Sequence, residues 1–379
     1  MTRNTFAGAA LTALAALLPG CNLTLDDLNK NLDTVCNDKG VCTSLKAFGN
    51  SVEQQMTAAN AVGWAWAVSG PGLANTGASG MARTAADSPE RPFDQDTTLD
   101  VASVSKVITG VAVLQALHQT GHTVDTKISG YLPPDWKPGA NVDTITFKEL
   151  LTHSSGFRAG GNAVDYASLK TMVEGGVTLA DKQQYAYVNA NFALFRVILP
   201  YLTGFTDPGA AERDAATSAA YVKYVQEHVW KPLGRTVDTK SALTQPTLIY
   251  PTNPGATHGI DFKDTTLISG GRGWYASTAD LWNLLRSLHY SETLLDAPQR
   301  TQMEQGLLGF DDGQVSDGHY PHHNGYLWVP VDNNGGVASI NSEVAILPTG
   351  AVAVLISNSP ADVTGIVAKA YEDSRSVKK

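Results

Sequence analysis

The sequence contains few charged residues, and acidic ones predominate among them. Asp, Glu, Lys and Arg make up 17% of the 379 residues, against about 25% in typical soluble domains, and the net charge is −9. Because an acidic chain gains little from a phosphate backbone, we expect no nucleic-acid partner. Glycine (35) and proline (18) are close to average use, which argues against a collagen-like or largely disordered chain.

Long hydrophobic runs are also absent from the body of the chain, so no membrane span is expected beyond the N-terminus. The first 20 residues are typical of an export signal, with Arg3 before the apolar stretch Phe6–Leu18. The following Leu18-Pro19-Gly20-Cys21 resembles the lipobox of bacterial lipoproteins, in which Cys21 carries a lipid anchor. We therefore expect export, to the periplasm, a lipid-anchored position or the medium. Simple cleavage at this site and a cytosolic chain with a frayed terminus are the alternatives.

Only three cysteines are present, and they bear on the compartment. If Cys21 carries lipid, Cys36 and Cys42 remain as a pair around a turn-prone segment. A disulfide between them would stabilise the folded chain by about 2 kcal/mol and would persist only in an oxidising compartment. Two free thiols are the alternative. No second Cys or His pair is near in the sequence, so no metal site is expected there.

Hydrophobic patterning places strands at both ends of the chain. Residues 21–43 are polar and are interpreted as a tether, and Ser44–Asn60 has the spacing of a helix capped by Ser44. Trp64–Val68 and Leu73–Gly80, with a glycine-rich turn between them, predict a β-hairpin. Three more strands are predicted near the C-terminus: Tyr326–Val331, Ser342–Leu347 and Ala351–Ile356.

Helical patterning dominates the middle of the chain. The spacing of apolar residues predicts helices at Val104–His118, Ala190–Tyr201, Ala219–Trp230 and Asp280–His289. These elements predict an α+β fold, in which both chain ends build one antiparallel sheet around a mostly helical inserted part. The expected boundaries are about 44–84 and 315–372 for the sheet part, about 85–314 for the helical part, and 373–379 for a charged, frayed tail.

Ser103 and Lys106 are three positions apart at the start of a predicted helix. This spacing puts the hydroxyl and the amine on one helix face, one turn apart. A serine hydroxyl becomes a good nucleophile when a base takes its proton, and lysine can be that base if burial and nearby positive charge lower its pKa. The chain has no Gly-x-Ser-x-Gly pattern, so an α/β-hydrolase nucleophile elbow is not supported.

Two further motifs follow in the sequence. Tyr187-Val188-Asn189 is the only Tyr-x-Asn in the chain, and we interpret Tyr187 as a proton shuttle whose pKa a lysine ammonium lowers. The Asn189 amide can orient the lysine and a substrate carbonyl. His323-Asn324-Gly325 comes just before a predicted strand, where the glycine would let a substrate approach the strand edge. A packed loop and a tight turn are the structural alternatives.

The order Ser-x-x-Lys, Tyr-x-Asn, His-x-Gly resembles the serine β-lactamase and penicillin-binding protein superfamily. The chain looks most like the branch of class C β-lactamases, D-alanyl-D-alanine carboxypeptidases, D-aminopeptidases and related esterases. Leu150–Phe157, Tyr224–Gly234 and Gly270–Leu281 are also similar to family signatures, so the resemblance covers about residues 45–370. It implies a β-lactamase/transpeptidase-like fold. Members of this superfamily need no metal, so neither a metal nor another cofactor is expected.

The resemblance also implies a role for each motif residue. Ser103 would be the acylated nucleophile, and Lys106 and Tyr187 would share the general base and acid work. The backbone N–H groups of Ser103 and Tyr326 would form an oxyanion hole, each contributing about 3 to 4 kcal/mol of transition-state stabilisation. The residues implied to bind substrate or the oxyanion are Asn189, His323, Asn324, Gly325 and Tyr326.

The third motif departs from the Lys-Thr-Gly of many relatives, whose first two residues grip a substrate carboxylate. His323 and Asn324 stand in those places, and both weaken carboxylate recognition. We therefore expect a serine hydrolase that cleaves ester, amide or D-amino-acid peptide bonds of a small-molecule or peptide substrate. A D-alanyl-D-alanine carboxypeptidase or class C-like β-lactamase is one alternative. A non-catalytic protein that binds penicillin or cell-wall peptides, or a scaffold, is another.

Overall fold

The computed structural model describes residues 33–158, 163–331 and 336–377. The expected export signal at residues 1–20 and the expected lipid site Cys21 lie outside these residues, so both remain predictions. Across the described ranges, no helix is long and apolar enough to cross a membrane.

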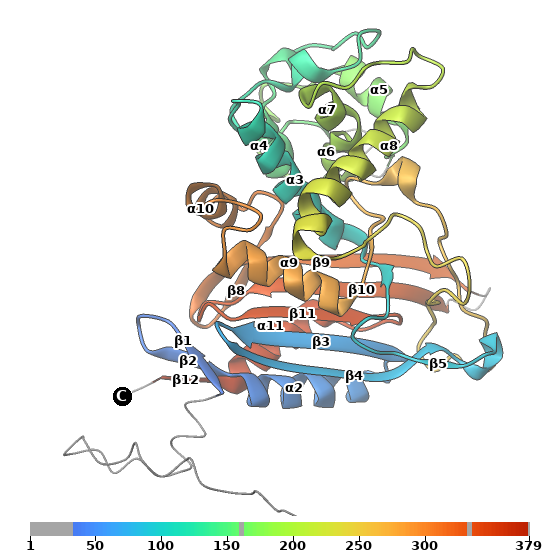
Figure 1. Ribbon diagram of the computed structural model, residues 1–379, viewed down its shortest axis with the longest axis vertical. Helices are drawn as coiled ribbons and strands as arrows, with labels where there is room; N and C mark the ends of the chain where they lie inside the picture. Colours follow the sequence, from blue (N-terminus) through green and yellow to red (C-terminus); the bar gives the residue numbers. More distant parts are fainter. Residues whose placement is uncertain (1–32, 159–162, 332–335, 378–379) are drawn as a thin grey trace, which may run out of the picture.

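A seven-stranded antiparallel sheet forms the lower half of the molecule as drawn in Figure 1. Its strands, in spatial order, are β5 (Arg91–Pro92), β4 (Leu73–Arg83), β3 (Gly63–Gly70), β11 (Val352–Ser357), β10 (Val337–Ile346), β9 (Gly318–Pro330) and β8 (Asp311–Val315). Because β3 pairs with β11, the expectation that both chain ends build one sheet is confirmed. The smaller sheets contain β1 (Thr34–Cys36), β2 (Val41–Ser44) and β12 (Arg375–Val377), and β6 (Leu99–Asp100) and β7 (Tyr275–Ala276).

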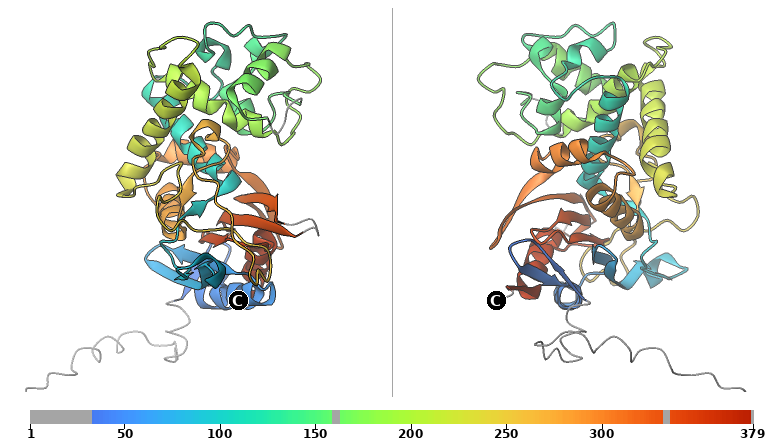
Figure 2. Two further views of the ribbon diagram at one scale, coloured as in Figure 1. Left: turned by 90° about the vertical axis from the view of Figure 1, so that its right-hand side faces the viewer. Right: turned by 60° about the vertical axis from the view of Figure 1, so that its left-hand side comes forward.

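Helices cover both faces of the large sheet. Two of them, α2 and α11, pack against the face away from the inserted helical part, while α9 covers the opposite face (Figures 1 and 2). The inserted part forms the upper half of the molecule in Figure 1, and α3 runs into it from the sheet. The helices are α2 (Leu45–Ala58), α3 (Ser105–Gln119), α4 (Phe147–Leu151), α5 (Tyr166–Gly175), α6 (Asn189–Ala193), α7 (Phe195–Leu202), α8 (Arg213–Val225), α9 (Thr278–Tyr290), α10 (Ala297–Gln305) and α11 (Val363–Ser374).

The strand β3 is buried on both faces, and its successive side chains point alternately into two hydrophobic cores. Trp64 and Trp66 lie in the core beneath α2 and α11. Ala65, between them in sequence, faces the larger core that the sheet shares with the helical part. On that side Trp282 of α9 donates its Nε1–H to Ser69 Oγ at 2.8 Å, which ties the helix to the strand. Large residues on one face and small ones on the other let helices approach both sides.

The helix α2 begins at the predicted capping residue. Ser44 Oγ accepts a hydrogen bond from the backbone N–H of Ala47 at 3.2 Å. Phe48, Val52 and Met56 recur at helical spacing and are buried against the sheet. The predicted helix is therefore confirmed, with its end two residues earlier than expected, at Ala58.

Part of the segment expected to be a tether is folded instead. The strands β1 and β2 form a hairpin that the disulfide between Cys36 and Cys42 closes. The Asn37 side chain stabilises the turn, because its Oδ1 accepts two backbone N–H groups, from Lys39 and Val41. Each strand is only three or four residues long, so no apolar alternation could identify it, although Val35 packs into the core beneath α2.

The tail expected to fray is also folded as far as the structure describes it. The helix α11 continues to Ser374, and β12 then pairs with β2. Arg375 holds the Asp317 carboxylate through two hydrogen bonds of 2.7 and 2.6 Å. Arg375, one of the charged residues that suggested fraying, is therefore a partner in an ion pair that holds this part of the chain.

Two predicted boundaries in the middle of the chain also differ. The predicted helix Ala190–Tyr201 is divided at Leu194 into α6 and α7. The sheet part resumes at Asp311 with β8, earlier than the expected residue 315. The sequence of β8, Asp-Asp-Gly-Gln-Val, has almost no apolar periodicity, so only its pairing with β9 makes it a strand.

Replacing Phe48 by alanine is expected to lower the free energy of unfolding by about 3 to 5 kcal/mol, because the ring is 1% exposed and its loss leaves a cavity. Gln54→Ala, on the exposed side of the same helix, is the control and should change stability by no more than about 0.5 kcal/mol. Chemical denaturation followed by tryptophan fluorescence measures both. Equal midpoints for the two variants would contradict this account of the core.

Candidate active site

Ser103 lies in a short 3-10 turn, Ala102–Val104, that leads directly into α3. Ala102 has a φ of +46°, a left-handed conformation that is uncommon outside glycine. The buried Asp100 carboxylate holds this turn, since its Oδ1 accepts from the backbone N–H groups of Ala102 at 2.8 Å and Gly273 at 3.2 Å. The strain at Ala102 is therefore maintained by buried contacts, as is common at functional sites.

Lys106 is the second residue of α3, one turn after Ser103, and its amine reaches back to the Ser103 hydroxyl. The Nζ atom is 2.9 Å from Ser103 Oγ, 3.0 Å from Asn189 Oδ1 and 2.9 Å from the carbonyl oxygen of Gly271. As an ammonium, Lys106 donates to all three. As a neutral amine, it donates to Asn189 and Gly271 and directs its lone pair at the Ser103 hydroxyl. The amine is thus held in place in both protonation states.

Burial lowers the pKa of Lys106 to about 7. Loss of water around the fully buried side chain is the main cause, because it disfavours the charged form. The Asp311 carboxylate acts in the opposite direction, and the Arg272 guanidinium lowers the pKa further. A large fraction of the protein therefore carries a neutral amine beside Ser103 at neutral pH.

Tyr187 approaches Ser103 from the other side. Its hydroxyl donates to Ser103 Oγ at 2.9 Å, and its ring, 41% exposed, packs on the ring of His153 with 4.5 Å between centroids. The sequence predicted a lowered pKa, which is wrong: burial, aided by the Asp311 carboxylate, raises the pKa of Tyr187. The Lys106 amine lies over the phenol ring, 4.9 Å from its centroid, and its nearest oxygens belong to other residues. Tyr187 is therefore a neutral hydrogen-bond donor.

The ring of His153 packs against the ring of Tyr187. Its Nδ1 accepts from the backbone N–H of Val188 at 3.2 Å, which orients the Tyr-x-Asn segment. Burial, together with the nearby Lys106 and His323, lowers the pKa of His153 to about 3. The ring therefore stays neutral and positions the phenol.

The His-Asn-Gly motif lies inside β9, and the predicted strand start at Tyr326 is wrong, because β9 begins at Gly318. A Cβ on Gly325 would lie 2.2 Å from Ser342 Oγ and 2.3 Å from the carbonyl oxygen of Val101. The glycine therefore admits the protein's own nucleophile turn, where the sequence predicted room for a substrate.

The register of β9 decides which of its backbone groups face the site. The N–H of Val331 bonds to the carbonyl of Gly336 across to β10, and the pairing continues without a shift to His322. In an antiparallel ladder, alternate residues direct their N–H and C=O groups at the partner strand. Gly325 therefore bonds toward β10, and the N–H of Tyr326 points the other way. Since β8 pairs only as far as His322, this N–H faces an open edge beside the Ser103 turn.

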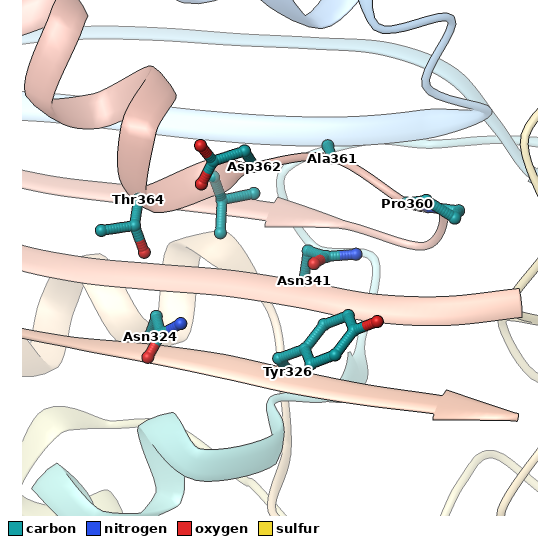
Figure 3. Close-up of a pocket in the computed structure, with 8 residues that line it drawn as sticks. Asn324, Tyr326, Asn341, Pro360, Ala361, Asp362 and Thr364 are labelled. Atoms are coloured by element: carbon teal, nitrogen blue, oxygen red, sulfur yellow. The ribbon is translucent and has the colours of Figure 1, made fainter. Parts of the chain in front are cut away.

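The side chains of Asn324 and Tyr326 lie on the face of the sheet that α11 covers, away from Ser103. They line a pocket with Asn341 of β10 and with residues 360–364, at the start of α11 (Figure 3). His323, the residue before Asn324, points the other way, with its ring centroid 6.2 Å from that of Tyr187. The prediction that the Asn324 side chain contacts substrate is therefore wrong, because successive side chains of a strand point to opposite faces of the sheet.

The three histidines of β9 have separate partners. Their nearest hydrogen-bond partners are Asp312 for His319, Glu343 for His322, and the carbonyl oxygen of Asn324 for His323. Within the ranges that the structure describes, no group of three His, Cys, Asp or Glu side chains is placed to hold a metal ion. Burial and the nearby Lys106 keep the pKa of His323 well below its usual value.

Two participants had no clear signal in the sequence. The Gly271 carbonyl accepts from Lys106, but a backbone group is invisible in the residue type. Asp311 reaches the site only because β8 pairs with β9, and its Oδ1 accepts from Tyr185 Oη at 3.2 Å. The family signature at Gly270–Leu281 was the only indication of Gly271, and nothing in the sequence indicated Asp311.

Comparison with known proteins places this geometry in a family. The model described as Beta-lactamase matches residues 48–371. A protein of Bacillus subtilis (strain 168), whose name, penicillin-binding protein PbpX, is itself provisional, is 24% identical over 199 residues. That match covers 51% of this chain and 46% of the relative, so the chain aligns with about half the length of the curated relative it matches.

Solved structures share the fold at low sequence identity. The β-lactamase/D-alanine carboxypeptidase from Pseudomonas syringae has a TM-score of 0.64 at 15% identity, with 86% of this chain and 98% of that chain covered. The D-stereospecific amidohydrolase from Streptomyces sp. has a TM-score of 0.62 at 18% identity, with the same coverage. At these identities the likeness shows the fold, which is the β-lactamase/transpeptidase-like fold that the sequence predicted. Because the family model spans most of the sequence, the chain belongs to the β-lactamase family and has the hydrolase fold of that family.

Proposed function

We propose that this protein is a serine hydrolase that cleaves ester or amide bonds through an acyl-enzyme on Ser103. One observation carries the proposal: Ser103 Oγ lies 2.9 Å from both Lys106 Nζ and Tyr187 Oη. The amine has a lowered pKa and the phenol a raised one. The serine therefore has a proton acceptor on one side and a proton donor on the other.

Acylation follows from this arrangement. The neutral Lys106 takes the hydroxyl proton as Ser103 Oγ attacks the substrate carbonyl carbon. The N–H groups of Ser103 and Tyr326 receive the developing oxyanion at the open edge of β9. Tyr187 then gives its proton to the leaving oxygen or nitrogen, and the Lys106 ammonium returns one to the phenolate. A water molecule attacks the acyl-enzyme with the same groups as base and acid, which frees the carboxylic acid and restores Ser103.

The charges around the site favour substrates without a carboxylate beside the scissile bond. His323 is neutral, Asn324 points away, and Asp311 adds a negative charge. β-Lactams and D-alanyl-D-alanine peptides carry such a carboxylate, so both are weaker candidates than esters and amides that lack one. The name of the Streptomyces relative supports amide cleavage on this fold.

Ser103→Ala is expected to lower p-nitrophenyl ester turnover at least about 1,000-fold and to keep the fold, because the nucleophile is lost. Labelling by a fluorophosphonate, followed by mass spectrometry, should fail in the variant and succeed in the wild type. Ser168→Ala, a partly exposed serine of α5, is the control and should keep both properties. Full turnover by Ser103→Ala would exclude Ser103 as the nucleophile.

Tyr187→Phe keeps the ring on His153 and removes the proton donor. We expect kcat for an anilide or alkyl ester to fall by about 100- to 10,000-fold, because these leaving groups need a proton. A p-nitrophenyl ester should lose less, since nitrophenolate leaves without one. Equal losses for the two substrate types would show that Tyr187 is not the general acid.

The pH dependence of kcat/KM for an uncharged ester should report Lys106. Below an apparent pKa of about 7 the amine is protonated and cannot accept the Ser103 proton, so the rate falls as pH falls. Above it, the rate levels off. Measurement from about pH 5 to 9 distinguishes this profile from that of an ordinary lysine, for which the rate would still be rising at pH 9 because its pKa is about 10.4. A flat profile would mean that Lys106 is not the base.

A further inference from the structure

Asp311 brings a carboxylate to the active site without a fixed cation to balance it. Its side chain is 22% exposed, and its Oδ1 accepts from Tyr185 Oη at 3.2 Å. In the part of the chain that the structure describes, no lysine or arginine forms an ion pair with it. The Lys106 amine is close enough to feel its charge, but Ser103, Asn189 and Gly271 already occupy that amine.

The second oxygen of Asp311 faces another acceptor. Its Oδ2 lies 3.8 Å from His323 Nε2. The Nδ1 of the same ring is 2.8 Å from the carbonyl oxygen of Asn324, and a carbonyl only accepts, so Nδ1 carries the proton. The ring is neutral, because burial and Lys106 oppose a second proton. Two acceptors, His323 Nε2 and Asp311 Oδ2, therefore lie 3.8 Å apart, and no hydrogen-bond donor from the described residues is shared by them.

A primary ammonium group matches this pair. It offers three N–H donors and one positive charge to two acceptors, one of which is charged. His323 is 2% exposed, and its hydrogen bond to the Asn324 carbonyl uses Nδ1, so an ammonium group beside Asp311 would give Nε2 a donor. Tyr185, Leu307 and Phe310 line a pocket together with Asp311 and supply apolar surface for a short aliphatic chain.

The pair also lies beside the reacting atoms. Tyr187 stands between them, with its hydroxyl on Ser103 Oγ and its ring centroid 6.2 Å from that of His323. One substrate molecule that reaches around the Tyr187 ring would therefore contact both Ser103 and Asp311.

We propose that Asp311 and His323 form a subsite for a primary ammonium group of the substrate, so that the preferred substrates are esters or amides with a free amine on a short chain. This inference rests on the proposed serine hydrolase function and specifies its substrate class. It assigns the recognition of positive charge to the position where many relatives recognise negative charge.

The test compares p-nitrophenyl esters of ω-amino acids, from glycyl to 6-aminohexanoyl, with alkanoyl esters in which a methyl group replaces the ammonium. Hydrolysis in the presence of Ser103→Ala is subtracted as the blank. At the best chain length, kcat/KM should be at least about tenfold higher for the ammonium ester, as expected for charge-assisted hydrogen bonds. Equal values at every length would overturn the proposal.

Asp311→Asn keeps the shape of the side chain and removes its charge. The ratio of kcat/KM for the ammonium ester to that for the alkanoyl ester should fall to about one, because kcat/KM falls for the ammonium ester only. Asp312→Asn is the matched control, because Asp312 is the next residue of β8 and its carboxylate is held 2.8 Å from His319 Nδ1. It should change the ratio much less. An equal fall in both variants would indicate a diffuse negative potential and overturn the subsite.

Inhibition of the wild type keeps the test decisive if Asp311→Asn does not fold. With an uncharged ester as substrate, n-hexylammonium should inhibit competitively, with a Ki at least about tenfold lower than that of 1-hexanol. Equal inhibition by the two compounds would overturn the proposal.

Binding to Ser103→Ala separates this inference from the proposed function. Titration with n-hexylammonium, followed by NMR of the histidine ring protons, should show saturable binding that the double variant Ser103→Ala/Asp311→Asn lacks. If the wild type hydrolyses no ester but this binding is seen, the proposed function fails and the subsite stands. If no binding is seen, the subsite is wrong whatever the wild type hydrolyses.

Discussion

The burial of one amine is the constraint on which the site depends. Lys106 is fully buried on a helix that is buried from Ser105 to Leu117, and an ammonium group removed from water costs several kcal/mol unless acceptors replace the lost hydration. Ser103, Asn189 and Gly271 supply those acceptors, one for each N–H. The same burial that makes the charge costly makes the neutral amine accessible near pH 7. Desolvation and fixed hydrogen bonds thus create a base from a residue that is ordinarily protonated.

The scaffold exists to bring those acceptors together. Lys106 lies on α3 where it leaves the sheet, Asn189 begins α6 in the helical part, and Gly271 precedes β7. Each comes from a different stretch of chain, and the sheet adds β9 from the C-terminal end. Gly325 lets the Val101 carbonyl approach within van der Waals contact of that strand, which sets the distance between the nucleophile and the open strand edge. A bulkier residue there would separate Ser103 from the Tyr326 N–H.

Charge around the site follows from the same convergence. Asp311 raises the pKa of Lys106 while burial lowers it, so one carboxylate both moderates the base and leaves negative potential where a substrate would bind. His323 cannot neutralise it, since burial keeps the ring uncharged. Asp311 therefore affects both the basicity of Lys106 and the charge of the substrate that the site favours. A lysine at the third motif would neutralise this carboxylate and remove the second effect.

Local patterns were sufficient for some elements and insufficient for others. The helix α2 and the hairpin of β3 and β4 were predictable, because Ser44 caps one and an apolar alternation around Trp64 and Trp66 defines the other. The short strands β1, β8 and β12 were not, because they are three to five residues long and their pairing with other strands, rather than an apolar pattern, defines them. The α+β class followed from the order of the long elements, which the short strands do not change.

The order of the three motifs, through their resemblance to a known superfamily, determined the chemistry expected of Ser103, Lys106 and Tyr187. The Ser-x-x-Lys spacing added that the hydroxyl and the amine lie one turn apart at the start of a helix. Tertiary structure alone decided the rest. The direction of the Tyr187 pKa, the face on which Asn324 lies and the presence of Asp311 all depend on what distant strands and helices place around them. Solvation, register and neighbouring charge are properties of the folded assembly, and a local pattern contains none of them.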